Sequence, residues 1–216
     1  MTKELDSLRQ KETYEVVEKP KDRGKRSSHS FGPESACAET SKTISLEENR
    51  AATLAARTAR MIFALVAAFD LDLRQRDAVT AFLNSRLNKE IYAGMPEGFT
   101  IPGMCWKLVR ALYGLRMSPR LWQQEAAAVL SKLGLQPVPE DPCIFVGKEI
   151  IVFFYVHDIL IACHWTARER ARQLERDLEA HWELTDHGEA EWFLNILGGR
   201  IHWKVAYHIF FIKTEL

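Results

Sequence analysis

The stretch Tyr155-Val156-His157-Asp158 places residue types that can do chemistry in an unusual setting. Apolar runs flank it on both sides, at residues 150–154 and 159–162. Two such runs separated by a tight polar pair predict a buried β-hairpin with its turn at His157-Asp158. Burying an unpaired charge is costly, so a carboxylate at this turn is expected to hold a metal ion. The simpler alternative is a turn-forming aspartate that faces solvent.

Asp77 lies between two predicted elements. Residues 69–74 alternate apolar and polar side chains, which predicts a strand, and residues 78–84 predict a short helix. On position alone, Asp77 is a candidate helix N-cap, a role that aspartate fills well. Asp70 and Asp72 follow the strand alternation, so we expect them on a solvent-facing strand edge and not at a metal ion.

Two longer helices are expected before residue 135. Residues 47–68 are rich in alanine and carry an apolar face of Leu54, Met61 and Leu65, which predicts the first. Ser118 as N-cap and Pro119 at the first position open the second, and Gly134 is placed to close it. The apolar face of this second helix comprises Trp122, Ala126, Val129, Leu130 and Leu133.

A third helix is expected after Thr166, which forms a capping-box pattern with Glu169. The apolar face of this helix comprises Ala171, Leu174, Leu178 and Trp182. A second face, which we expect to be solvated, comprises Arg168, Arg172, Glu175, Arg176 and Glu179. Short strands packed against a few helices predict an α+β fold.

The composition limits the class of protein. The 216 residues suit one domain, and a hydrophobic content of 47% can supply a core. No apolar run approaches the roughly 20 residues that span a bilayer. The charged N-terminus lacks the apolar core of a signal peptide, so we expect an intracellular protein with no membrane partner. Paired spacing is absent among Cys37, Cys105, Cys143 and Cys163, which predicts reduced and mostly buried thiols.

Basic and aromatic residues gather between positions 106 and 122. The set comprises Lys107, Arg110, Arg116 and Arg120 with Trp106, Tyr113 and Trp122. Positive charge interleaved with aromatic rings suits contact with single-stranded nucleic acid or a primer-template. A solvated rim around buried rings is an equal alternative. The 29 basic and 29 acidic residues leave no net charge, so phosphate binding would depend on such local clusters.

Several segments, in order and spacing, resemble one protein family. They are Arg76-Asp77-Ala78-Val79-Thr80-Ala81-Phe82-Leu83-Asn84, Met95-Pro96-Glu97-Gly98-Phe99, Ala111-Leu112-Tyr113-Gly114-Leu115-Arg116, Ser118-Pro119-Arg120-Leu121-Trp122, Asp141-Pro142-Cys143-Ile144-Phe145 and Tyr155-Val156-His157-Asp158-Ile159-Leu160. Together they resemble the reverse transcriptases of copia-type retrotransposons. The resemblance covers roughly residues 51–197.

The resemblance implies an RNA-directed DNA polymerase with a fingers-palm-thumb architecture, of which the matched region is mostly the palm. In that family palm carboxylates bridge two Mg²⁺ (or Mn²⁺) ions that align a primer 3′ hydroxyl with a dNTP. Asp77 and the adjacent positions 157 and 158 would be these carboxylates. Phe82 would be the aromatic gate against a ribose 2′-OH. Ser118, Pro119 and Arg120 would lie along the template and incoming nucleotide. The implied partners are an RNA or DNA primer-template and dNTP.

The chain departs from the family pattern at position 157, where His157 replaces an expected aspartate. Mg²⁺ prefers oxygen ligands, and a neutral imidazole is a poorer, uncharged substitute. Read from position alone, His157 could be a general base or a zinc ligand, but no second His or Cys lies at a useful spacing. We therefore expect polymerase activity to be absent or very weak.

Two further departures concern the rest of the architecture. The Lys-x-Arg strand expected of the fingers is missing between residues 23 and 51, and no complete thumb follows residue 197. The sequence predicts a lead-in at residues 1–23, a polar and disordered connector at 24–50, a palm-like domain at 51–197 and a divergent tail at 198–216. A non-catalytic nucleic-acid-binding remnant and a decayed fragment with no selected function remain alternatives.

Overall fold

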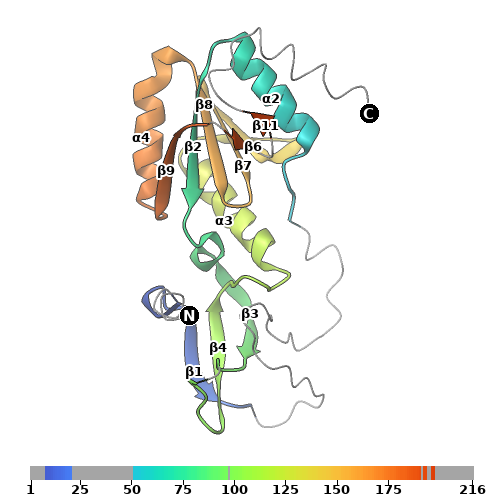
Figure 1. Cartoon of the computed structure of the whole chain (residues 1–216), viewed down its shortest axis with the longest axis vertical. Helices are drawn as coiled ribbons and strands as arrows, with labels where there is room; N and C mark the ends of the chain where they lie inside the picture. Colours follow the sequence, from blue (N-terminus) through green and yellow to red (C-terminus); the bar gives the residue numbers. More distant parts are fainter. Residues whose placement is uncertain (1–7, 21–50, 97, 191, 194–195, 198–216) are drawn as a thin grey trace. The chain divides into compact units, whose positions relative to one another are not determined.

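The computed structural model describes residues 8–20, 51–96, 98–190, 192–193 and 196–197 (Figure 1). The chain divides into two compact units. Unit 1 contains Met1–Ala51 and Thr80–Glu125, and unit 2 contains Ala52–Val79 and Ala126–Leu216. The predicted connector and tail lie outside the described residues, so the predicted domain boundaries stay predictions. The strands form antiparallel sheets accompanied by helices, which confirms the predicted α+β class.

Unit 1 is built on a three-stranded antiparallel sheet in the order β1-β4-β3. Its strands are β1 (Tyr14–Glu18), β3 (Arg86–Ala93) and β4 (Met104–Arg110). Ile91 of β3 and Leu108 and Trp106 of β4 belong to one cluster of buried side chains. Tyr14 stacks on Trp106 with ring centroids 3.9 Å apart, which ties β1 to β4. A short 3-10 helix, η2 (Ala81–Asn84), precedes β3.

Unit 2 is built on a six-stranded antiparallel sheet in the order β5-β6-β7-β8-β2-β9. The strands are β2 (Asp72–Ala78), β5 (Gln136–Val138), β6 (Asp141–Gly147), β7 (Ile150–Tyr155), β8 (Asp158–Cys163) and β9 (Leu184–Glu189). A separate two-stranded ribbon pairs β10 (Trp192–Phe193) with β11 (Ile196–Leu197). The helices are α2 (Ala56–Ala68), η3 (Trp165–Ala167) and α4 (Arg168–Glu179), together with α3 (Ser118–Lys132) from Ala126 onward.

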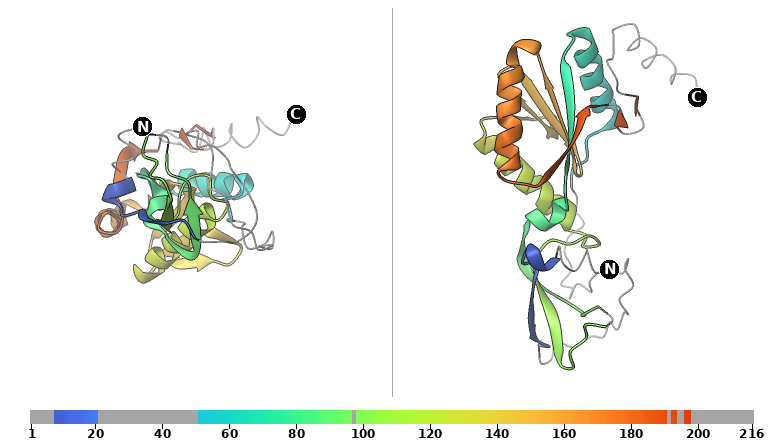
Figure 2. Two further views of the ribbon diagram at one scale, coloured as in Figure 1. Left: turned by 90° about the horizontal axis from the view of Figure 1, so that it is seen from below. Right: turned by 60° about the vertical axis from the view of Figure 1, so that its left-hand side comes forward.

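Two helices of unit 2 cover opposite faces of its sheet (Figure 2). Phe63 of α2 meets the ring of Phe153 on β7 edge-on, with centroids 6.1 Å apart. Through the strand registers, the face of Phe153 continues onto Leu160 and Gln75. Alternation along β2 puts Arg76 on the other face, where it pairs with Glu175 of α4. The apolar face of α4 is thereby buried, and α2 buries Ala59, Ile62, Phe63, Val66 and Ala67. The apolar face predicted for the first helix was wrong at Met61 and Leu65, which are exposed.

The region before Asp77 differs from its prediction. The first long helix begins at Ala56, because residues 51–55 are not helical and Ala55 is extended, with φ −68° and ψ 137°. Asp70 then adopts a left-handed φ of 48°, which delays the strand until Asp72. The strand runs on to Ala78 because it pairs with β8 through Asp77 and with β9 through Ala78. Predicting a strand over residues 69–74 was therefore wrong in both bounds.

The local positions of three acidic residues follow from this strand. Asp77 is not a helix N-cap, because it lies within β2, and Thr80 stands at the N-cap of η2. Asp72 is the first residue of β2, where the strand pairs with β8 and not yet with β9, and its carboxylate pairs with Arg168. Asp70 lies in a turn before β2 rather than in a strand.

The third helix starts differently from its prediction, although its apolar face is confirmed. The 3-10 turn η3 precedes α4, and Thr166 donates its backbone N–H to His164 Nδ1, so no capping box forms with Glu169. The predicted apolar residues are buried: Ala171, Leu174, Leu178 and Trp182. Glu175, which we expected on a solvated face, is instead buried beneath two arginines of β2.

The helix α3 (Ser118–Lys132) closes as predicted, with Gly134 following at φ +86°. Its predicted face is buried at Trp122, Ala126, Val129 and Leu130, with Leu133 partly buried. Ser118 is already the first helical residue, and its hydroxyl donates to the Leu112 carbonyl instead of capping the helix.

The remaining composition-based predictions concern thiols and membranes. Cys105, Cys143 and Cys163 are buried thiols outside any disulfide, as predicted, whereas Cys37 lies outside the described residues. None of the helices in the described part of the chain combines the length and apolar character that crossing a bilayer requires.

Candidate functional site

The predicted hairpin is present as β7 and β8, joined by a two-residue turn at Val156-His157. Asp158 is the first residue of β8 and pairs with Tyr155, so the turn lies one residue earlier than predicted. Val156 adopts φ +55°, the positive value that two-residue hairpin turns require. The flanking apolar residues of both strands are buried, and this core holds the turn at the end of the sheet.

The structure brings Asp77, His157 and Asp158 together within unit 2. Asp77 and Asp158 are direct partners in the antiparallel ladder between β2 and β8. Directly opposite residues of such a ladder project their side chains from the same face. The turn is tied to the same strand, because the backbone N–H of Ala78 donates to the carbonyl of His157 at 3.0 Å. His157 Nε2 lies 3.7 Å from Asp77 Oδ1.

Gln75 completes this group, although the sequence analysis did not predict a role for it. Its Nε2 donates to Asp158 Oδ1 at 2.8 Å. Gln75 lies two residues before Asp77 on β2, so the two side chains share one face of the strand. The signal that could have identified it is this strand alternation, once β2 is known to extend through Asp77.

Salt bridges stabilise the opposite face of β2. Arg76 Nη2 lies 2.9 Å from Glu175 Oε2, and Arg76 Nη1 lies 2.6 Å from Asp186 Oδ2. Arg74 pairs with the same two carboxylates, and Asp72 pairs with Arg168. Burial alone would lower the pKa of Arg76, but the hydrogen bonds and charges of Glu175 and Asp186 outweigh it and raise that pKa. We call Arg74, Arg76, Glu175 and Asp186 the ion cluster.

The donor set at the turn fits a divalent ion only in part. Mg²⁺ is commonly bound by one or two carboxylates, with water and substrate phosphates completing its octahedron, and Asp77 with Asp158 can supply these. An imidazole at position 157 brings no negative charge for a second ion. Among the described residues, no group of three or more His, Cys, Asp and Glu side chains is arranged to hold a metal. The site therefore suits one hard cation better than two.

The other predicted site residues belong to unit 1. Phe82 is buried and packs against Tyr113 with ring centroids 4.5 Å apart. Ser118 is fully buried, and Pro119 and Arg120 follow it, partly buried, in the first turn of α3. The roles of these residues in nucleotide binding stay predictions.

The basic and aromatic residues at positions 106 to 122 do not form one continuous surface. Trp106 and Trp122 are buried in the core, and Lys107 pairs with Glu90 at 3.0 Å. Arg110 donates to two backbone carbonyls at the end of η2. The exposed members include Tyr113, which is 58% exposed, and Arg116.

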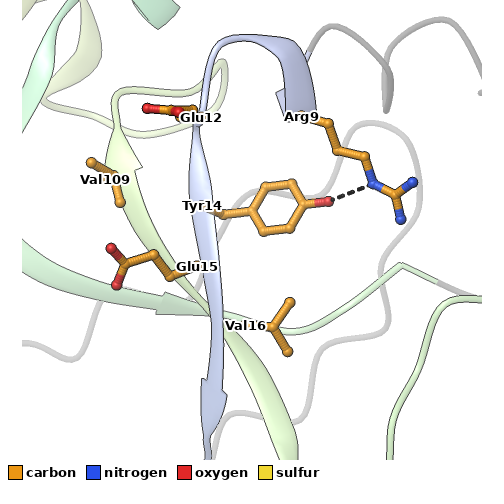
Figure 3. A pocket seen from close by; sticks show the side chains of 6 residues that line it. All are labelled: Arg9, Glu12, Tyr14, Glu15, Val16 and Val109. Atoms are coloured by element: carbon orange, nitrogen blue, oxygen red, sulfur yellow. Dashed lines mark hydrogen bonds between the residues drawn. The ribbon is translucent and has the colours of Figure 1, made fainter.

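A hollow in unit 1 is lined by residues of β1 and its surroundings (Figure 3). The lining comprises Arg9, Glu12, Tyr14, Glu15, Val16 and Val109. Arg9 Nε donates to the Tyr14 hydroxyl at 3.4 Å across this hollow. Its mixed charges and open apolar side chains show no convergent catalytic group, and none of the predicted site residues lines it.

Comparison with known proteins gives a consistent family. The model of the family described as reverse transcriptase (RNA-dependent DNA polymerase) matches residues 42–206. The chain is 30% identical over 227 residues to the retrovirus-related Pol polyprotein from transposon TNT 1-94 of Nicotiana tabacum, an alignment covering 93% of this chain and 17% of the polyprotein. It is 33% identical over 138 residues to that from transposon RE1 of Arabidopsis thaliana, covering 60% of this chain and 9% of the polyprotein.

A shorter relative is the putative transposon Ty5-1 protein of Saccharomyces cerevisiae, which is 28% identical over 127 residues, or 56% of this chain and 41% of that protein. The chain thus spans less than half the length of each of these relatives. Its matched region contains the β2 strand, the β7–β8 hairpin and α4. The chain therefore belongs to the reverse transcriptase (RNA-dependent DNA polymerase) family, in the form found in copia-type retrotransposon polyproteins.

Proposed function

We propose that this chain is the palm part of a retrotransposon RNA-directed DNA polymerase whose templated nucleotidyl transfer is absent or very weak. The observation that carries the proposal is the direct pairing of Asp77 with Asp158 across β2 and β8, with His157 beside them. Both carboxylates are only partly buried, and they lie together at the end of a hairpin whose strands are buried. Their alignment is what a cation-dependent phosphoryl site requires.

Each residue of the site has a proposed task. Asp77 and Asp158 would hold a divalent ion, Mg²⁺ or Mn²⁺, and in such enzymes divalent ions neutralise the reacting phosphates. His157 occupies the place of a third carboxylate and lowers the negative charge of the site by one unit. If this loss costs about 4 kcal/mol of transition-state stabilisation, the rate falls about a thousandfold, at about 1.36 kcal/mol per tenfold.

The residues that the family resemblance assigns to nucleotide binding lie in unit 1. Phe82, whose ring packs against that of Tyr113, would be the gate against a 2′-OH. Pro119 and Arg120 at the start of α3 would contact the template and the incoming nucleotide. The partners of this proposed activity are an RNA or DNA primer-template and dNTP.

Primer extension tests the proposal. The chain, His157→Asp and Asp77→Asn are compared for templated dNTP incorporation in Mg²⁺ and in Mn²⁺. His181→Asp serves as the matched control, since His181 is an exposed histidine in the same unit. We expect background incorporation by the chain and a gain in His157→Asp that the control does not reproduce. Robust incorporation by the chain itself that disappears in Asp77→Asn would refute the proposed loss of activity.

A second candidate is binding of single-stranded nucleic acid without catalysis, favoured by the exposed ring of Tyr113 near the exposed Arg116. Binding through phosphates must weaken steeply with added salt. Fluorescence anisotropy of a labelled oligonucleotide, with Tyr113→Ala and Arg116→Ala as variants, separates this function from a protein with no ligand.

A further inference from the structure

Gln75 makes a contact with the proposed site that the family resemblance did not point to. Its amide Nε2 donates to Asp158 Oδ1 at 2.8 Å, from a strand 83 positions earlier in the chain. An amide hydrogen bond to a carboxylate is charge-assisted and stronger than one between neutral groups. The bond therefore has the strength to select one orientation of the Asp158 carboxylate.

The backbone that carries Gln75 is held on both sides. Its strand β2 lies between β8 and β9 in the sheet of unit 2. The residues before and after it, Arg74 and Arg76, belong to the ion cluster and form salt bridges on the opposite face. Gln75 thus starts from a fixed position, which is the condition for a side chain to position another one.

The geometry also leaves Asp158 able to bind. The hydrogen bond engages Oδ1 of Asp158, and a carboxylate has a second oxygen with lone pairs of its own. Asp77 projects from the same face of β2 as Gln75 and stands directly across from Asp158. An amide that holds Oδ1 therefore orients the remaining oxygen without replacing it as a ligand.

We propose that Gln75 is a positioning residue for Asp158. Its hydrogen bond fixes the orientation of that carboxylate before a divalent cation binds to it. The inference rests on the proposed function in assigning a cation to Asp158. Hydrogen-bonding partners of metal ligands typically contribute about tenfold to a hundredfold in metal affinity. The alternative is that Gln75 only satisfies a partly buried amide and matters for stability alone.

The test uses the full chain and two independent measurements. Mn²⁺ affinity is measured by electron paramagnetic resonance in His157→Asp, with and without Gln75→Leu. The matched control is Gln173→Leu, because the exposed Gln173 of α4 makes the same kind of bond, from its Nε2 to Asp177 at 2.7 Å. We expect Gln75→Leu to weaken Mn²⁺ binding at least tenfold and Gln173→Leu to leave it unchanged. Equal Mn²⁺ affinity with and without Gln75→Leu would overturn the proposal.

The second measurement needs neither metal nor activity. The side-chain amide of Gln75 is observed by NMR in the otherwise unaltered chain and in Asp158→Ala and Asp77→Ala. We expect its amide protons to shift and exchange faster in Asp158→Ala only, and an unchanged amide in Asp158→Ala would overturn the hydrogen bond. If His157→Asp binds no Mn²⁺, the metal site of the proposed function fails, and the NMR result alone decides whether Gln75 orients Asp158.

Discussion

The ion cluster allows one substitution to be predicted in detail, Glu175→Gln. The Glu175 side chain is only 6% exposed and faces Arg76, which is also 6% exposed, at 2.9 Å. Glutamine keeps the size but removes the charge, which leaves two arginines with the single carboxylate of Asp186. Breaking a buried ion pair from one side costs about 3–5 kcal/mol. Because Asp186 still compensates part of the charge, we expect a loss of about 3 kcal/mol in the free energy of unfolding.

Urea denaturation followed by far-UV circular dichroism measures this loss. With a slope of about 2 kcal/mol per M, the midpoint should fall by about 1.5 M. Glu179→Gln on the same helix is the matched control, since Glu179 is exposed and such changes usually remain within about 0.5 kcal/mol. If both variants shift the midpoint equally, Glu175 is a surface glutamate after all and the description of the ion cluster is wrong.

Three further predictions concern His157, Cys143 and Asp186. His157→Asp should lower Zn²⁺ affinity and raise Mg²⁺ affinity, each about tenfold by calorimetry, because imidazole suits zinc and carboxylate suits magnesium; unchanged affinities would separate His157 from the cation site. Burial, together with the charge and hydrogen bond of Asp141, raises the pKa of Cys143 to about 12. Iodoacetamide at pH 8 should therefore spare Cys143 in the folded chain by mass spectrometry, and stability should fall above about pH 9, where only the unfolded thiol ionises. Burial acts to raise the pKa of Asp186, but the Gly188 N–H and Arg76 outweigh it, and that pKa is lowered. This group's contribution to stability is present above its ordinary pKa of about 3.9 and is lost as pH falls through its lower folded value. The stability difference between the chain and Asp186→Asn should therefore be larger at pH 6 than at pH 3, and a difference independent of pH would contradict the assignment.

The features predicted correctly from the sequence are those with local signals. The β7–β8 hairpin follows from two short apolar runs around a turn, and the buried faces of α3 and α4 follow from helical periodicity. The start of β2 was misplaced because alternation continues through Phe69 and Asp70, whereas the backbone turns at Asp70 with a positive φ.

The features that were missed depend on contacts between distant segments. On its own helix, Glu175 alternates with arginines and looks solvated; its burial comes from Arg74 and Arg76, about 100 positions earlier. Gln75 likewise could be identified only once β2 is known to extend through Asp77, because its partner Asp158 lies on another strand. Asp77 was placed between two elements, and its ladders with β8 and β9 show that it belongs to the strand.

The two faces of β2 together explain how the carboxylates remain aligned. A strand that slips by one residue exchanges the side chains of its two faces. The buried charges on one face of β2 therefore determine which side chains lie on the other face. Arg76, held by Glu175 and Asp186, can occupy its place only in the register that pairs Asp77 with Asp158. Replacing His157 changes one side chain on a turn and leaves this register intact. Loss of the ion cluster, in contrast, would loosen the strand that carries both Asp77 and Gln75, and the pairing of Asp77 with Asp158 would lose its alignment although both carboxylates remain.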